Sequence, residues 1–352
     1  MQFSVFVVRA VLAAVLVSPL QGCGTMYLAQ AARGQWQVMH ARKPIDAVIL
    51  DKNTPDTVRA RLTEVRAARE FASRELGLPD NRSYRTFADV KRSFVVWNVV
   101  AAPEFSVEPR RWCFPIAGCV AYRGYFAEAK ARKFAAGLRA QGLDAVVGGV
   151  PAYSTLGKLA DPVLNTMMGY GDSELAAIVF HELSHQVVYV AGDSEFNEAF
   201  AVTVEQAGLA RWLKARGREN ELQRYAARRQ RQQQFLALFN RTRARLAALY
   251  AEKLSAETTR ERKRAIFVTL ETDIRELAKQ LGAPNAYSDW IADGLNNAHL
   301  ASVATYYDCV PGFERLLSVY NGDLPAFYSA VRELAKEPRV ERHAKLCHSQ
   351  PQ

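Results

Sequence analysis

The spacing of His181 and His185 around Glu182, in "VFHELSHQ", constrains the fold of this 352-residue chain more than any other feature. On a helix, residues four apart lie on one face about one turn from each other, so both imidazoles can reach one ion. One helix face supplies only two such ligands, and a catalytic zinc site takes a third from another element. The candidate is Glu198, in "NEAFAVTVEQAG". The chain must therefore bring two segments together here.

The flanking residues predict a hairpin of two helices. Ser173 is a typical N-cap for a helix over residues 174–190, and Gly192 would end that helix. A second helix is predicted over residues 195–216. A tight turn between the two can return Glu198 to the face that carries the histidines.

The position of Glu182 indicates hydrolytic chemistry. Next to the first histidine, its carboxylate can reach water on the ion instead of the ion itself. Zinc lowers the pKa of such water towards about 7, and Glu182 can accept its proton as the water attacks a peptide carbonyl. The alternative is a helix pair without metal, in which every buried ionisable group would need its own partner.

The first 22 residues predict an export signal. After Arg9, the apolar run "AVLAAVLVSPL" is too short to span a bilayer comfortably, and it ends at "LQGC". Small residues before a cysteine resemble a bacterial lipoprotein signal, in which Cys23 becomes the lipidated first residue. We therefore expect a membrane-anchored lipoprotein of the bacterial cell envelope, facing the periplasm. An ordinary cleaved signal or a short membrane anchor is the alternative.

Export changes the interpretation of the other cysteines, which are Cys113, Cys119, Cys309 and Cys347. An even number in an oxidising compartment predicts disulfides. Cys113 and Cys119 bracket "CFPIAGC" and could close a small ring, while Cys309 and Cys347 would tie the tail, residues 341–352, to the body. A zinc site made by Cys347 with His343 and His348 is the alternative, although its spacing fits no common site.

The charge of the chain limits the kinds of binding partner that are expected. The net charge is +10, and charged residues make up 23% of the chain, which argues against wholesale disorder and suits a surface near anionic lipid. A basic run within residues 219–254 predicts a solvated helix face, with lipid contact as the alternative. Nucleic acid is not an expected partner of an exported protein.

The order of predicted elements indicates an α+β fold that is mostly α-helical. Residues 23–160 are predicted to form a small N-terminal portion that contains strands, and residues 161–340 are predicted to be nearly all helix. Helices are predicted over residues 27–43, 57–76, 125–142, 219–254 and 256–281, and strands over residues 92–102 and from residue 144.

A family resemblance adds to this reading. "HELSHQ" with "NEAFAVTVEQAG" resembles the zinc peptidases in which a glutamate completes the site, most closely the membrane alanyl aminopeptidases. The likeness implies a zincin-like fold, His181, His185 and Glu198 as zinc ligands and Glu182 as the base. It also implies that two neighbours support the ligands, namely Asn197 and Glu205.

The chain departs from that group in two ways. The interval between His185 and Glu198 is shorter, so the connection must be tight. The acidic glycine–alanine–methionine motif, which holds the substrate's amino terminus in those enzymes, is missing.

The whole mature chain is similar to a family of bacterial lipoproteins described as predicted aminopeptidases. The stretches that carry this likeness are "WCFPIAGC", "AYSTLG", "DPVLNTM" and "NNAHLASVATYYDCVPGFERLL". The resemblance implies zinc-dependent peptide hydrolysis in the envelope, with a preference for amino-terminal residues. The alternatives are an envelope endopeptidase and a non-catalytic scaffold whose helices bind a partner.

Further site residues follow from the needs of peptide hydrolysis. Tyr306 is predicted to stabilise the oxyanion because it lies in the block "NNAHLASVATY". The other candidates for that role are Tyr307, Tyr320, His299 and Tyr153.

Substrate binding points to two other places. "GGVPAYSTLG", with Tyr153 and Ser154, is either an edge strand that pairs with the peptide or an ordinary loop. Glu195 is predicted to hold the substrate's α-ammonium group, with Glu174 as the alternative.

Overall fold

The computed structural model describes residues 23–114 and 118–347, apart from the side chains of residues 23–25 and 305–306. The predicted signal over residues 1–22 and His348 therefore lie outside the described residues. The same holds for the side chains of the predicted lipidation site, Cys23, and of Tyr306.

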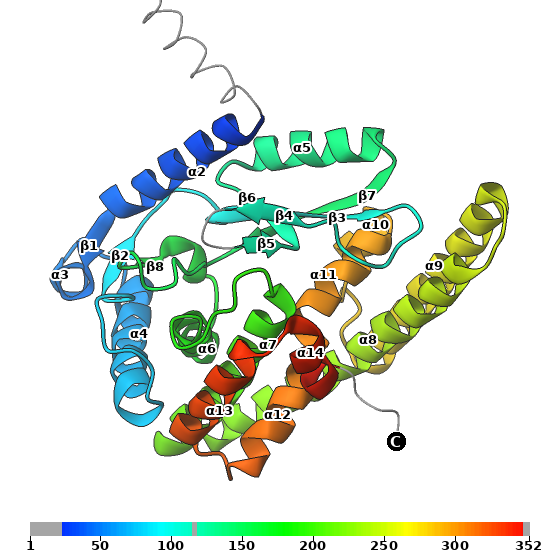
Figure 1. The fold of residues 1–352 in the computed structure, drawn as a ribbon. Helices are drawn as coiled ribbons and strands as arrows, with labels where there is room; N and C mark the ends of the chain where they lie inside the picture. The colour runs from blue at the N-terminus through cyan, green and yellow to red at the C-terminus, as the bar shows by residue number, and fades with distance from the viewer. Residues whose placement is uncertain (1–22, 115–117, 348–352) are drawn as a thin grey trace, which may run out of the picture.

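The chain is mostly helical, and its described strands form three small sheets (Figure 1). The N-terminal half consists of α2 (Cys23–His40), β1 (Arg42–Pro44), α3 (Ile45–Leu50), α4 (Asp56–Glu75), β2 (Thr86–Ala88), β3 (Val96–Pro103), β4 (Trp112–Phe114), β5 (Gly118–Val120), β6 (Tyr122–Tyr125), α5 (Glu128–Ala140), β7 (Leu143–Val150) and β8 (Val163–Leu164). The C-terminal half consists of a 3₁₀ turn (Asn165–Met167), α6 (Asp172–Ser184), α7 (Ser194–Ala215), α8 (Glu219–Ala251), α9 (Ala256–Gln280), α10 (Ser288–Ala292), α11 (Asn297–Tyr307), α12 (Val310–Val319), α13 (Leu324–Lys336) and α14 (Arg339–Leu346). The predicted α+β class with a mostly helical chain is confirmed.

The largest sheet has the antiparallel order β6-β3-β7, with β7 at its edge. Alternate residues of β3 face opposite sides, as the pleat requires. Trp97 and Val99 pack into the cluster that includes α5, whereas Val100 packs with Ala298 and Ala301 of α11. Figure 1 shows α5 above this sheet and α11 below it. The sheet is therefore covered on both faces.

One hydrophobic core joins the two halves of the chain. It includes Leu62 of α4, Phe180 of α6, Phe200 of α7 and Phe327 of α13. The portions expected on either side of residue 160 thus share a core. None of the helices within residues 23–114 and 118–347 combines the length and hydropathy of a membrane span.

The helices α8 and α9 form a long hairpin that extends from the body (Figure 1). Phe235 and Leu246 of α8 pack against Phe267 and Leu270 of α9 in a separate cluster. The predicted helices over residues 219–254 and 256–281 match these two elements within a few residues.

The helix predicted over residues 174–190 was too long, because α6 ends at Ser184. The backbone N–H groups of Gln186 and Val187 donate to Leu183 and Ser184 in a tighter turn. The chain then reverses at Gly192, whose φ of 83° glycine adopts without strain. This early end gives the short connection that the sequence requires.

Both predicted disulfides are present. Cys113–Cys119 closes the hairpin of β4 and β5, and Cys309–Cys347 ties the end of α14 to the start of α12. The alternative zinc site at Cys347 is excluded because its sulfur is bonded to Cys309.

Candidate metal site

Helices α6 and α7 bring three ligand atoms together. Glu198 Oε2 lies 3.4 Å from His181 Nε2 and 3.8 Å from His185 Nε2. All three atoms lie within 4.8 Å of one another. Tetrahedral ligands at about 2 Å from zinc are separated by roughly 3.3 Å, so these atoms could hold one ion after small side-chain adjustments.

Asn197 forms the turn that presents Glu198. Its side-chain Oδ1 accepts from the N–H of Val190, and its Nδ2 donates to the C=O of Val190, both at 2.8 Å. This paired contact fixes the start of α7 against the end of the connection. Asn197 thus acts on the site through the backbone, one residue before Glu198.

Glu205 orients the first histidine. Its Oε2 lies 3.0 Å from His181 Nδ1. Glu198 and Glu205 are seven residues apart and therefore lie on the same face of α7. A carboxylate at Nδ1 holds the N–H there and leaves Nε2 free to bind an ion. Of the two predicted supporting residues, Glu205 contacts a predicted ligand directly, whereas Asn197 contacts the backbone of Val190.

Burial shifts the protonation of this cluster in the metal-free protein. Burial, reinforced by the carboxylates of Glu198 and Glu205, raises the pKa of Glu182 to about 8. Burial alone would lower the pKa of His181, but hydrogen bonds to Glu198 and Glu205 raise it well above its usual value. Burial lowers the pKa of His185 to about 4. Three carboxylates thus surround two imidazoles, an arrangement that a cation would neutralise.

These two histidines and three glutamates form the metal cluster, and they line one cavity of about 840 Å³, the metal cavity. Its wall includes Glu182, Tyr153 and Ser154, together with part of α2. The loop after β7 is held in shape by Asp161, which accepts from the N–H of Thr155 at 2.8 Å. The two residues predicted for substrate binding on this loop therefore share a cavity with the metal cluster.

Three tyrosines in this cavity were not predicted as site residues, and one of them is Tyr27 of α2. The other two are Tyr122 of β6 and Tyr189. Burial and the nearby carboxylates of Glu198 and Glu182 raise the pKa of Tyr122 well above its usual value. Tyr189 stands four residues after His185, which is a sequence signal for a position near the histidines. Tyr122 is brought in by the sheet, and no local pattern marks it.

Two other residues that were predicted as candidates for stabilising the oxyanion line different cavities. Tyr307 lines the metal cavity, whereas His299 lines a separate cavity of about 180 Å³ between the sheet and α11. Tyr306 lies on α11, and its side chain is outside the described part of the chain.

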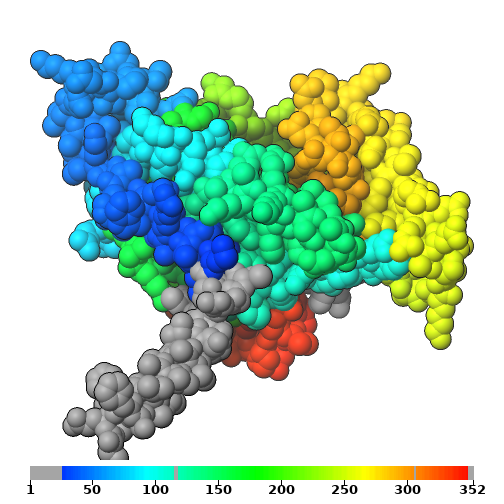
Figure 2. All heavy atoms as spheres, turned by 90° about the horizontal axis from the view of Figure 1, so that it is seen from above, coloured from blue at the N-terminus to red at the C-terminus, as the bar shows by residue number. Residues whose placement is uncertain are grey.

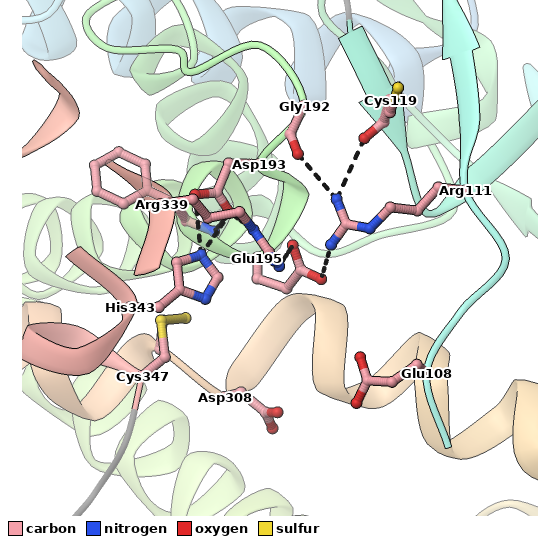
Figure 3. A network of polar contacts seen from close by, with 12 residues as sticks. Glu108, Arg111, Cys119, Gly192, Asp193, Glu195, Asp308, Arg339, His343 and Cys347 are labelled. Atoms are coloured by element: carbon pink, nitrogen blue, oxygen red, sulfur yellow. Dashed lines mark hydrogen bonds and ion pairs between the residues drawn. A yellow bond between two sulfur atoms is a disulfide. The ribbon is translucent and has the colours of Figure 1, made fainter. Parts of the chain in front are cut away.

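The structure places Glu195 away from the metal cluster, so its predicted role at the α-ammonium group needs correction. Its carboxylate pairs with Arg111 at 3.0 Å and with Arg339 at 3.4 Å (Figure 3). It lines a second cavity, of about 690 Å³, and not the metal cavity. The reason is the ion pairing: Glu195 and Glu198 are three apart and so are neighbours on α7, but the two arginines hold the Glu195 carboxylate in the second cavity. The alternative, Glu174, pairs with Arg228 on the surface.

Asp193 anchors the start of α7 to the C-terminal helix (Figure 3). Its buried carboxylate accepts from the N–H of Phe196 at 3.3 Å and from Arg342 Nε at 2.8 Å. It also lies 2.8 Å from His343 Nε2. The disulfide Cys309–Cys347 holds the end of the same helix, α14. The predicted tail thus begins inside a helix that fixes the position of α7.

The Cys113–Cys119 hairpin supports the same turn from the other side. Arg111 donates to the C=O of Gly192 at 2.9 Å. A Cβ on Gly118 would lie only 2.5 Å from the N of Gly192, so glycine is required for this close approach. Residues far apart in sequence therefore converge on the α6–α7 turn.

Asp193→Asn should lower the free energy of unfolding by about 3 kcal/mol, because it leaves Arg342 and His343 facing a neutral amide. Burial alone would raise the pKa of Asp193, but His343 and Arg342 outweigh it and lower this pKa to about 2. The stabilisation is therefore present above pH ~4 and is lost as the pH falls towards 2. Urea unfolding of both proteins from pH 7 to pH 2 measures this.

Asp323→Asn is the matched control for this prediction. Asp323 caps α13 by accepting from the N–H of Ala326, but it is exposed and has no ion pair among the described residues. Asparagine caps a helix as well as aspartate does, so this change should cost at most about 0.5 kcal/mol. Equal losses in the two variants would show that the ion pairs of Asp193 with Arg342 and His343 add nothing to stability.

Comparison with known proteins places the chain in a family. No curated protein and no solved structure matches it. Residues 26–346 match the family described as "Putative aminopeptidase", a range that includes every described residue of the metal cluster and nearly the whole fold. The chain therefore belongs to this family of putative aminopeptidases.

Proposed function

We propose that the protein is a zinc-dependent peptidase of the bacterial envelope, with a zincin-like site and a preference for amino-terminal residues. One observation carries the proposal: the Nε2 atoms of His181 and His185 and Oε2 of Glu198 converge in the wall of a large cavity. The donor set of two imidazoles and one carboxylate is one that zinc takes in hydrolytic enzymes. When bound, zinc supplies a Lewis acid that polarises water and the peptide carbonyl.

Glu182 moves the proton in this proposal. It is buried beside His181 and lines the cavity, but it does not belong to the three converging ligands. Its carboxylate accepts a proton from the attacking water and returns it to the leaving amine.

A tyrosine hydroxyl supports the reacting carbonyl oxygen. Tyr306 remains a prediction for this role. Among the described side chains, Tyr122 lines the cavity close enough to Glu198 and Glu182 for both to affect its pKa. Its raised pKa keeps the hydroxyl protonated, so that it can donate a hydrogen bond to the developing oxyanion.

The edge strand β7 supports binding of an extended peptide. It pairs only with β3 in the described sheet, and the chain that continues from Val150 to Ser154 lines the metal cavity. A peptide can add to such an edge through backbone hydrogen bonds, while the cavity receives its side chains. The three carboxylates of the cavity, Glu182, Glu198 and Glu205, all belong to the metal cluster. The side-chain amides of Gln35 and Asn98 also line the cavity, and their oxygens can accept a hydrogen bond from a substrate's ammonium group.

Hydrolysis of short peptides tests the proposed function. Zinc-loaded protein should cleave aminoacyl and peptidyl amides, lose this activity on treatment with a zinc chelator and regain it when zinc is restored. Substrates with a free amino terminus should be cleaved faster than their acetylated forms. Equal rates would instead indicate an endopeptidase. Absence of both zinc binding and cleavage would favour the non-catalytic scaffold.

The envelope location is part of the same proposal and rests on the sequence around Cys23. Mass spectrometry of the mature protein should find a lipid-modified Cys23 as the first residue. An unmodified terminus at another position would refute the lipoprotein assignment.

A further inference from the structure

The outer side of α2 carries apolar side chains that the rest of the described chain does not cover. Met26 is 81% exposed, Leu28 50% and Trp36 58%. The opposite side of the helix is packed, since Val38 is fully buried and a Cβ on Gly34 would collide with Phe126. The helix is therefore held in place by one side while a tryptophan and two large aliphatic side chains remain in solvent.

The helix α5 lies beside α2 on the same face of the molecule, as Figures 1 and 2 show. The guanidinium group of Arg123 joins them, because it lies 4.0 Å from the ring of Tyr27 on α2 and 4.6 Å from the ring of Phe134 on α5. The solvent side of α5 is basic, with Lys130, Arg132 and Lys133 exposed. Apolar and basic groups thus meet on one face.

We propose that this face, made by α2 and α5, docks on an anionic lipid surface. Trp36, Met26 and Leu28 would enter the boundary between headgroups and acyl chains, where tryptophan is favoured. Lys130 and Lys133 would attract the anionic headgroups. Neither lysine has an ion pair among the described residues, so their charges are available to a partner.

The start of α2 identifies lipid as the occupant. The apolar segment over residues 10–20 and the predicted lipidation site lie directly before the helix, which begins at Cys23 itself. No unstructured linker separates the expected anchor from the folded domain. A lipid attached at the first residue of α2 would hold the start of the helix at the membrane surface, and the exposed apolar side chains of α2 would then lay the rest of the helix along it.

This orientation would place the metal cavity near the membrane, and that inference rests on the proposed function. Tyr27, Ala31 and Gln35, from the inner side of α2, line that cavity. One helix would therefore separate the lipid surface from the metal cluster. The site would work on peptides close to the membrane, rather than at a distance from it.

Quenching of tryptophan fluorescence by brominated lipids tests the docking. The full chain is placed in vesicles of phosphatidylethanolamine and phosphatidylglycerol, with or without bromine on the acyl chains. Bromine should quench the natural protein, and Trp36→Phe should remove most of this quenching. The other four tryptophans are buried or half-buried, so they contribute little. Quenching reports contact with acyl chains whether or not Cys23 carries lipid.

The charge on α5 is tested with a matched pair of double variants. Lys130→Glu with Lys133→Glu should lower the docked-to-undocked ratio, measured by the same quenching, about tenfold or more. Arg241→Glu with Arg245→Glu makes the same charge change on exposed positions of α8 and should leave the ratio unchanged. All these changes are on the surface, and circular dichroism verifies that each variant folds.

Two results would overturn the proposal. One is a Trp36 that bromine does not quench in the natural protein. The other is a loss of quenching in the α8 double variant with none in the α5 variant, which would assign lipid contact to the basic hairpin instead. Zinc content and peptide hydrolysis are measured on the same variants. A failed docking test therefore leaves the zinc-peptidase proposal standing, and the reverse also holds.

Discussion

Glu182→Gln is expected to lower turnover by about a thousandfold while the protein keeps its zinc. Glutamine has the size and shape of glutamate, so the packing of α6 should not change. It cannot accept the proton of the attacking water, and general acid–base catalysis contributes effects of this magnitude. The ligand atoms of His181, His185 and Glu198 remain in place. Turnover with a peptide amide and zinc content by mass spectrometry are the two measurements.

Glu174→Gln is the control for this change. Glu174 lies earlier on the same helix, pairs with Arg228 at the surface and does not line the cavity, so turnover should stay near that of the natural protein. If Glu182→Gln retained normal turnover, Glu182 would not be the base. Loss of zinc in that variant would assign Glu182 to the metal instead of the proton.

The pH dependence of stability gives a second measurement on Glu182. Burial raises its pKa in the metal-free protein to about 8, above the ordinary value of 4.5. A group shifted in this direction stabilises the fold fully below about pH 4.5, and the contribution is lost as the pH rises through 8. Metal-free Glu182→Gln should therefore gain stability relative to the natural protein over this range.

His185→Ala and Glu198→Ala are each expected to weaken zinc binding by about a hundredfold or more. Zinc binding to small four-ligand sites amounts to about 10–16 kcal/mol, or about 3 kcal/mol for each ligand. Removing Glu198 also takes away the carboxylate that lies between the two imidazoles. Competition with a chelator of known affinity measures the change.

Two further variants calibrate the loss of zinc. Glu205→Gln keeps a hydrogen-bond acceptor for His181 Nδ1 but removes its charge, and it should weaken binding by only about ten- to a hundredfold. Glu195→Gln lies outside the metal cavity and should have no effect on zinc affinity. Unchanged zinc affinity in both alanine variants would mean that His181, His185 and Glu198 do not form the metal site.

Local patterns were sufficient for the helices that carry the metal cluster. The four-residue spacing of the histidines, the polar turn around Gly192 and the run after Asn197 predicted a helix pair within a few residues, except at the end of α6. The end of α6 was missed because the contacts that hold the chain after Ser184 come from residues outside the helix. The side chain of Asn197 forms hydrogen bonds with the backbone of Val190. Arg111, which directly precedes β4, donates a hydrogen bond to the C=O of Gly192.

The surroundings of the cluster were predicted less well. Glu195 has a suitable position in the sequence, one turn before Glu198, but Arg111 and Arg339 hold it in another cavity. Those arginines are 84 and 144 residues away in the sequence, by subtraction of the residue numbers. Tyr122 enters the metal cavity only because β6 pairs with β3. Such contacts have no periodicity that a single sequence reveals.

By itself, the sequence determined which reactive side chains are present and which of them lie close together along the chain: two imidazoles on one helix face, carboxylates on the next helix, and four cysteines that can form disulfides. These features depend on helix geometry and on covalent chemistry, which act over a few residues. Tertiary structure decided which carboxylates meet the imidazoles, which tyrosines share their cavity and which side of α2 stays exposed. Those outcomes depend on how distant elements pack around one core, because a side chain's direction is set by the partners that packing brings to it.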